Sequence, residues 1–227
     1  HFGDYIVAAY ARPDSDIRVS NWNGSYADID ETPYDDADKI QSVNHTNDYC
    51  DFGLSNVTDP AVHTGHVLRA RARKNAAGGH TRGIVIELRQ GTGGTVIASY
   101  TDTELTEVWD AITVTLSEAQ AGAITDYAAL TVRITSTGTV GTPPSSRRMV
   151  ECSWVELEAP ESALLDLMNR ITQAYPQATL FSLPSFGSEG VRRHIELGMR
   201  GEPAAVEQAM AEIRAEVTRL GYEWAAR

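Results

Sequence analysis

The spacing of the apolar residues changes at Pro160, and this change restricts the folds that the 227-residue chain can adopt. Before it, in the segment CSWVELE, apolar and polar residues alternate, which is typical of a β-strand. After it, in the segment ESALLDLMNRI, apolar residues recur every three or four positions, which is typical of an amphipathic helix. The sequence therefore predicts two domains, one built of strands over residues 1–159 and one with helices over residues 160–227.

Eight short segments between residues 38 and 158 show the strand pattern, with turn residues such as AAGGH and GTGG between them. The segments are KIQSV, YCDFGLS, HVLRARARK, RGIVIELRQ, TVIASYT, VWDAITVTL, ALTVRITS and RRMVECSWVELE. Short strands at this spacing predict an antiparallel sandwich or barrel. Because side chains alternate across a strand, Arg69, Arg71 and Arg73 are expected to point away from the core. The segment LSEAQAGAITDY is expected to form a short helical turn.

The C-terminal residues alternate between helical and strand patterns. Two helices are expected, the second beginning near Pro203 and ending at Gly221. Their apolar positions are Leu164, Leu167, Met168, Ile171 and Tyr175 in the first, and Val206, Met210, Ile213 and Val217 in the second. Between them, ATLFSL and VRRHIELGM flank the turn FGSEG and predict a hairpin. The order αββα predicts a small α+β domain whose tail YEW joins the hairpin in one sheet.

Several phrases of the first 160 residues belong together as a family pattern. They are RPDSDI, ADIDETPYDDADKIQS, GLSNVTDP, GHVLRARARKNAAGG, TVIASYTDTEL, AITDYAALTVRI and SWVELEAP. This part resembles a jelly-roll domain of tailed-bacteriophage virion proteins and environmental bacterial proteins, whose fold is similar to that of carbohydrate-binding modules. The resemblance implies a jelly-roll β-sandwich that ends at WVELEAP.

Residues 170–224 show a second resemblance. The phrases AYPQATLFSLPSFG, RRHIELGMRGEP and AMAEIRAEVTRLGYEW look like the C-terminal part of the competence/damage-inducible, molybdopterin-binding-like family. The Gly-rich and acidic ligand motifs of that family lie in a portion that this chain does not contain. The resemblance therefore implies no cofactor site.

The net charge of −12 limits the partners that the chain can bind. Most of the acidic excess lies in residues 1–160, and a negative surface repels phosphate backbones and anionic membranes. The sequence contains no apolar run of the ~18 residues that a membrane-spanning helix needs. We therefore expect neither nucleic acid nor membrane as a partner.

The acidic segment DIDETPYDDAD is a candidate metal site. Its carboxylates include Asp28, Asp30, Asp35 and Asp36, and calcium takes several oxygen ligands from such loops. The alternative is a solvated loop in which aspartates cap turns. The sequence therefore predicts no cofactor, with calcium as the alternative.

Arginines and aromatic residues are the candidate ligand-binding groups. Arg69, Arg71 and Arg73 offer planar guanidinium groups to an anionic glycan, unless they pair across the sheet with residues such as Glu87. Trp22, Tyr26 and Tyr34 fall in or beside predicted loops, where a ring can stack on a sugar. Trp22, in SNWNGSY, is expected to be the most exposed. Trp109 and Trp154 fall in strand patterns and are expected to be packing residues instead.

Cysteines and histidines complete the candidate residues. Cys50 and Cys152 fall in predicted strands near opposite ends of the sandwich and are expected to come close, with or without a disulfide. The histidines at positions 45, 63, 66 and 80 have no metal-ligand spacing and are interpreted as surface residues. His1 would bind copper only if it were a mature N-terminus.

The sequence contains no nucleophile elbow, phosphate-binding glycine loop or HExxH segment, so we interpret the chain as a non-enzymatic protein. We expect a virion structural, decoration or fibre-type protein, in the virion or outside the cell. Its expected partners are other virion or assembly subunits and further copies of itself, because the small C-terminal core needs completion. The alternative is a glycan-binding module that recognises a cell-surface polysaccharide.

Overall fold

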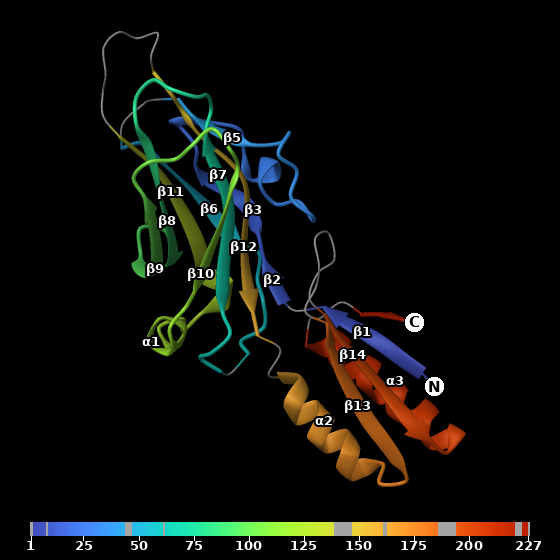
Figure 1. The fold of residues 1–227 in the computed structure, drawn as a ribbon. Helices are drawn as coiled ribbons and strands as arrows, with labels where there is room; N and C mark the ends of the chain where they lie inside the picture. The colour runs from blue at the N-terminus through green and yellow to red at the C-terminus, as the bar shows by residue number, and fades with distance from the viewer. Residues whose placement is uncertain are drawn as a thin grey trace. The chain divides into compact units, whose positions relative to one another are not determined.

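A computed structural model shows the fold of the chain (Figure 1). It describes residues 2–7, 9–43, 47–60, 62–138, 147–160, 163–185, 194–220 and 224–226. The chain divides into two compact units. The sandwich unit consists of Tyr10–Val57 and His63–Glu158, and the split unit consists of His1–Ala9, Thr58–Val62 and Ala159–Arg227.

Two antiparallel sheets form the sandwich unit. One has the strand order β3 (Pro13–Arg18), β6 (Tyr49–Leu54), β11 (Leu130–Gly138), β8 (Arg82–Gln90) and β9 (Thr95–Asp102). The other has the order β10 (Asp110–Thr115), β7 (Val67–Lys74), β12 (Val150–Ala159), β5 (Ile40–Ser42) and β4 (Trp22–Asn23), with β2 (Ala9–Ala11) also pairing with β12. Each of the eight predicted segments contains one strand, from β5 to β12. The predicted jelly-roll β-sandwich is confirmed.

Alternating side chains build the core between these sheets. Leu68, Ala70 and Ala72 of β7 are at most 1% exposed, as are the inward residues of β8 and β11. Burying one large aliphatic side chain stabilises a fold by about 1.5–3 kcal/mol, so two such facing rows hold the sheets together. The predicted helical turn is α1 (Glu118–Gly122), which begins at a capping box between Ser117 and Gln120. Two 3₁₀ turns, η1 (Tyr26–Asp28) and η2 (Tyr127–Ala129), complete the unit.

The split unit differs from the predicted αββα order. Its elements are β1 (Phe2–Val7), α2 (Ala163–Ala174), β13 (Ala178–Ser185), β14 (His194–Gly201), α3 (Pro203–Arg219) and β15 (Trp224–Ala226). They form one antiparallel sheet in the order β13-β14-β1-β15. The connectivity βαββαβ and this strand order are those of the ferredoxin-like class. The sandwich unit is therefore an insertion between the first strand and the first helix of the split unit.

One expectation about this unit is wrong. The first strand, assigned to the jelly roll by the division at residue 159, pairs with β14 over six positions from Phe2 to Val7. The error arises because a local apolar pattern identifies a strand but not its partner, and β1 pairs with β14 almost 200 residues away. The predicted place of the tail in the hairpin's sheet is confirmed for Trp224, because β15 belongs to that sheet and pairs there with β1.

The predicted apolar faces of the helices are confirmed. Helix α2 buries Leu164, Leu167 and Ile171, and helix α3 buries all four predicted positions, in one cluster with Leu197 and Met199 of β14. Helix α3 has Pro203 in its first turn, as predicted, while the predicted stop at Gly221 and the turn FGSEG lie outside the described residues. No described helix is long and apolar enough to cross a membrane.

Candidate functional site

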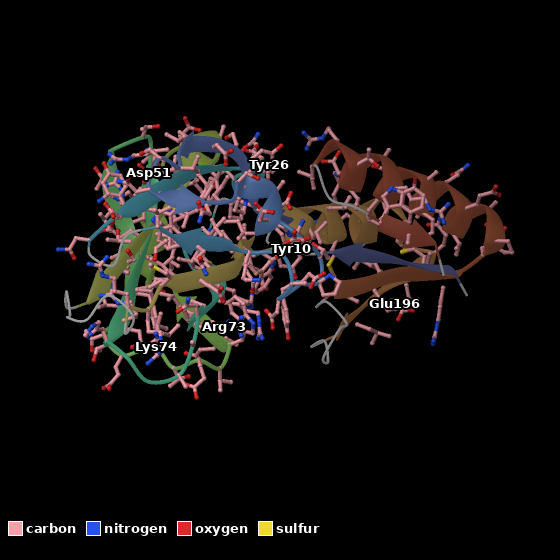
Figure 2. The ribbon with its side chains drawn as sticks, turned by 90° about the horizontal axis from the view of Figure 1, so that it is seen from above. Tyr10, Tyr26, Asp51, Arg73, Lys74 and Glu196 are labelled. Carbon is pink, nitrogen blue, oxygen red and sulfur yellow. The ribbon has the colours of Figure 1, made fainter. Side chains whose placement is uncertain are left out.

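The outer side of the sheet that contains β7 carries the predicted arginine row. Arg69, Arg71 and Arg73 alternate with the buried residues of β7 and are half-buried, so they face away from the core as predicted. Figure 2 shows Arg73 on one side of the sandwich and Asp51, from the other sheet, on the opposite side. The arginines therefore lie on one outer face of the unit.

Each arginine on this outer side forms an ion pair. The pairs are Arg12 with Glu156 at 2.9 Å, Arg69 with Glu158 at 2.5 Å, Arg71 with Asp36 at 2.7 Å, and Arg73 with Glu151 at 2.7 Å. The predicted cross-sheet pairing is correct in kind but wrong in the residue suggested, because Glu87 lies on the other sheet and pairs with Arg89. Three of the four carboxylates come from β12, the strand beside β7.

Asp36 holds Arg71 through two parallel hydrogen bonds. Arg71 donates from Nε to Oδ1 at 2.9 Å and from Nη2 to Oδ2 at 2.7 Å, and Ser153 donates its hydroxyl to Oδ1 at 2.8 Å. Burial raises the pKa of the Asp36 carboxyl, but the hydrogen bonds from Arg71 and Ser153 outweigh burial and lower this pKa. Asp36 is therefore a charged partner of Arg71.

The suggested calcium site is not formed by the acidic loop. Asp28 accepts a hydrogen bond from the Ser25 amide at 2.7 Å, and Asp35 accepts one from the Ala37 amide at 2.8 Å, so both cap turns. Asp30 lies near Glu31, whose pKa is raised by burial and then by the negative charge of Asp30. Among the residues that the structure describes, which include all of 28–38, no group of three or more His, Cys, Asp or Glu is arranged to hold a metal ion.

A β-bulge brings Trp154 to the same outer face. The register of β12 against β7 shifts between Cys152 and Trp154, so that Cys152 lies opposite Ala72 and Trp154 opposite Arg71. Strict alternation would turn Trp154 inward with Cys152, whereas the extra residue turns it outward. The expectation that Trp154 packs in the core is therefore wrong. Its indole nitrogen donates to the Glu31 carbonyl at 3.0 Å and fixes the ring.

Aromatic rings lie beside the paired arginines. Tyr34 is 40% exposed, its ring lies 4.0 Å from the Arg71 guanidinium carbon, and its centroid is 5.8 Å from that of Trp154 at an angle of 54°. The half-buried Trp109, predicted to be a packing residue, lies 4.5 Å from the guanidinium carbon of Arg73. We define the aromatic-arginine face as Tyr34, Asp36, Gln41, Arg71, Arg73, Trp109, Glu151 and Trp154.

Two predicted ligand-binding aromatics lie elsewhere. Trp22 is only 4% exposed and its indole nitrogen donates to the Asp48 carbonyl at 3.4 Å, so the expectation that it is the most exposed ring is wrong. Tyr26 is half-buried in η1, and its amide donates to Asp16 of β3, in the other sheet. Of the predicted residues, the structure therefore places Tyr34, Arg71 and Arg73 on this face, with Arg69 farther along β7, and leaves Trp22 and Tyr26 apart from them.

Glu151 and Gln41 are members of the face that the sequence did not suggest. Glu151 is 4% exposed and uses both oxygens, accepting from Arg73 Nε at 2.7 Å and from Gln41 Nε2 at 2.8 Å. The alternation in the segment VECSWVELE places Glu151 outward, which was the available clue. Its two partners depend on strand pairing, which the pattern does not reveal.

The outer face of the other sheet has a different character. Arg133 and Asp51 form a two-bond pair at 2.7 and 2.8 Å. The guanidinium carbons of Arg18 and Arg133 each lie 3.9 Å from the centroid of Tyr49, which also accepts a hydrogen bond from Arg18. Two arginines thus contact the ring of Tyr49, which is half-buried.

The cysteines and His66 belong to the interior. Cys50 and Cys152 are both fully buried and unbonded, and the pKa of Cys50 is raised first by burial and then by the nearby Cys152. The two thiols form no disulfide, and their close approach stays a prediction. His66 was expected at the surface but is fully buried, with its Nε2 atom 2.5 Å from the Tyr127 hydroxyl. The residues at positions 1 and 45 lie outside the described residues.

Comparisons with known proteins give similar folds at low sequence identity. No protein-family model matches the chain, and no curated protein matches it. Similar solved structures include module CBM6cm-2 of Cellvibrio mixtus lichenase 5A in complex with cellotriose (10% identity, TM-score 0.36, covering 68% of this chain and 98% of that one). A second is the family 30 carbohydrate-binding module of the Clostridium thermocellum cellulosomal cellulase Cel9D-Cel44B (14%, TM-score 0.35, 69% and 94%).

A third is the CBM36-1 domain of a multidomain xylanase from the hindgut metagenome of Trinervitermes trinervoides (10% identity, TM-score 0.33, covering 69% of this chain and 98% of that one). At these identities and TM-scores, any function of the present chain has to be argued from its own surface.

Proposed function

We propose that the sandwich unit binds a carbohydrate on the aromatic-arginine face and catalyses no reaction. The observation that carries this proposal is the exposed ring of Tyr34, which is 40% accessible and lies against Arg71 and Trp154. A pyranose ring has apolar C–H faces that stack on such a ring. A partly apolar surface with a few fixed polar groups is the usual form of a small-ligand site.

The polar members of the face suit sugar hydroxyls, which both donate and accept hydrogen bonds. Arg71, Arg73 and the Gln41 amide supply donors, and the carboxylate of Asp36, whose side chain is 31% exposed, supplies acceptors. These groups already bond to one another, so their side chains are held in place before a ligand arrives. Such preorganisation lowers the entropic cost of binding.

Binding is tested by a glycan array probed with the full chain, followed by native gels that contain each polysaccharide found. We expect retention of the chain in at least one gel, together with no increase in reducing ends on prolonged incubation. An array and a set of gels without any binding would contradict the proposal. Release of new reducing ends would contradict its non-enzymatic part.

The sequence-based interpretation as a virion structural or decoration protein stays a prediction, as do its virion subunit partners, its self-association and its location in the virion or outside the cell. Light scattering on the full chain tests self-association directly. A strictly monomeric chain would contradict an assembly role while leaving carbohydrate binding untouched.

A further inference from the structure

We propose that Asp36 and Glu151 determine the class of glycan that the face accepts, restricting it to neutral glycans and rejecting uronates and sulfated sugars. This inference rests on the proposed function and adds the ligand class to it. Its basis is the arrangement of charge on the outer side of this sheet, where four arginines form ion pairs with four carboxylates.

Arg71 is the decisive case. A guanidinium group binds a carboxylate best through two parallel hydrogen bonds, and a ligand carboxylate or sulfate would seek the same geometry. Asp36 already occupies it, with bonds of 2.9 and 2.7 Å from Nε and Nη2. Because Asp36 belongs to the same chain and is held by Ser153 at 2.8 Å, it competes at a high effective concentration.

Arg73 is also paired within the chain, with a second carboxylate, that of Glu151. Its Nε atom donates to Glu151, whose other oxygen is occupied by Gln41, and Trp109 lies 4.5 Å from its guanidinium carbon. The positive charge of Arg73 also helps to lower the pKa of the Asp36 carboxyl, after the hydrogen bonds from Arg71 and Ser153. An anionic ligand therefore meets neutralised pairs, whereas a neutral sugar meets exposed ring surface and oriented polar groups.

The test compares one polysaccharide in two charge states. The neutral polysaccharide found on the array is oxidised at its primary hydroxyls to carboxylates, and both forms are titrated against the full chain at low salt. We expect the oxidised form to bind at least about tenfold more weakly. The variant Asp36→Asn keeps the shape of the side chain but frees the Arg71 charge, and should bind the oxidised form about threefold to tenfold better than the unmodified chain does.

The matched control is Asp35→Asn, which removes the same charge one residue earlier, from an exposed carboxylate that accepts the amide of Ala37 in a turn. It should leave the preference unchanged. If Asp36→Asn does not fold, as judged by near-ultraviolet circular dichroism, Glu151→Gln tests the second pair in the same way. The increased affinity of either variant for the oxidised polysaccharide should disappear near 1 M salt, where the screening length is about 3 Å.

The outcomes separate the two proposals. No binding to any glycan would refute the proposed function and this inference with it. Binding of anionic glycans as tightly as neutral ones would refute the inference and leave the proposed function standing. Equal gains in Asp35→Asn and Asp36→Asn, or no gain in either, would show that the closed ion pair does not select the ligand.

Discussion

Removal of the Tyr34 ring should weaken carbohydrate binding by about tenfold to seventyfold. A fully buried tyrosine withdraws roughly 150–250 Å² from water. Since 40% of Tyr34 is exposed in the free chain, about 60–100 Å² remains for a sugar to cover. At about 25 cal/mol per Å², this contact is worth about 1.5–2.5 kcal/mol, and about 1.4 kcal/mol corresponds to a factor of ten in Kd.

Isothermal titration calorimetry on Tyr34→Ala measures this loss directly. Tyr34→Phe retains the ring and should keep most of the affinity. The matched control is Tyr26→Ala, because Tyr26 is a second, half-buried tyrosine of this unit but lies beside β3 of the other sheet. The unfolding temperature of each variant confirms that the sandwich is intact.

The reasoning would be refuted if a folded Tyr34→Ala chain bound the polysaccharide as well as the unmodified chain. It would equally be refuted if Tyr26→Ala lost as much affinity, because the ligand would then contact the other sheet. A loss in Tyr34→Phe as large as in Tyr34→Ala would assign the contribution to the hydroxyl group instead of the ring.

Three further predictions concern stability and reactivity. Asp51→Ala should lower the free energy of unfolding in urea by about 3 kcal/mol, because it removes the carboxylate that pairs with Arg133. The double variant Asp51→Ala/Arg133→Met should lose less stability than Asp51→Ala alone. Equal losses in the single and double variants would contradict a coupled pair. Burial raises the pKa of Asp36, but its hydrogen bonds lower this pKa by more than burial raises it, so the pKa is lower in the folded than in the unfolded chain. The ionised form of Asp36 therefore stabilises the fold above about pH 4, and this stabilisation is lost as the pH falls through the lowered pKa. The difference in Tm between the chain and Asp36→Asn should therefore shrink on acidification, and a constant difference would argue against it. Because burial raises the pKa of Cys152 to about 12 and that of Cys50 well above its ordinary value, neither thiol should react with a disulfide reagent at pH 8 until the chain is unfolded; rapid labelling of the native chain would contradict this.

The sequence predicted the parts of the fold that depend on local spacing. Every alternating segment between residues 38 and 158 became a strand, and both helices bury the expected positions, because burial of one face imposes period 2 or period 3.6 on the chain. The position of β1 could not be predicted in this way. Its place beside β14 depends on a pairing between distant segments, which leaves no local trace in the sequence.

For the candidate site, too, the sequence predicted the direction in which a strand residue points but not the residue with which it pairs. The outward direction of Arg71 follows from alternation on β7, but its partner Asp36 comes from a loop 35 residues earlier. Trp154 was assigned to the core because the bulge that turns it outward involves a single extra residue in a continuous alternating segment. Trp22 was assigned to the surface from its polar neighbours, yet the two-residue strand β4 turns it into the interior, where it is 4% exposed.

The insertion of the sandwich into the split unit fixes an order of events during synthesis. The ribosome makes β1 first and its neighbour β14 about 190 residues later, which takes about 10–40 s at usual elongation rates. Small β-sandwiches fold within milliseconds to seconds once their strands are available, so the sandwich has time to form before β14, the partner strand of β1, is made. The nascent chain must therefore carry β1 as an unpaired strand while a folded domain forms after it. Strand β15, which is made after β14, then pairs with the side of β1 away from β14.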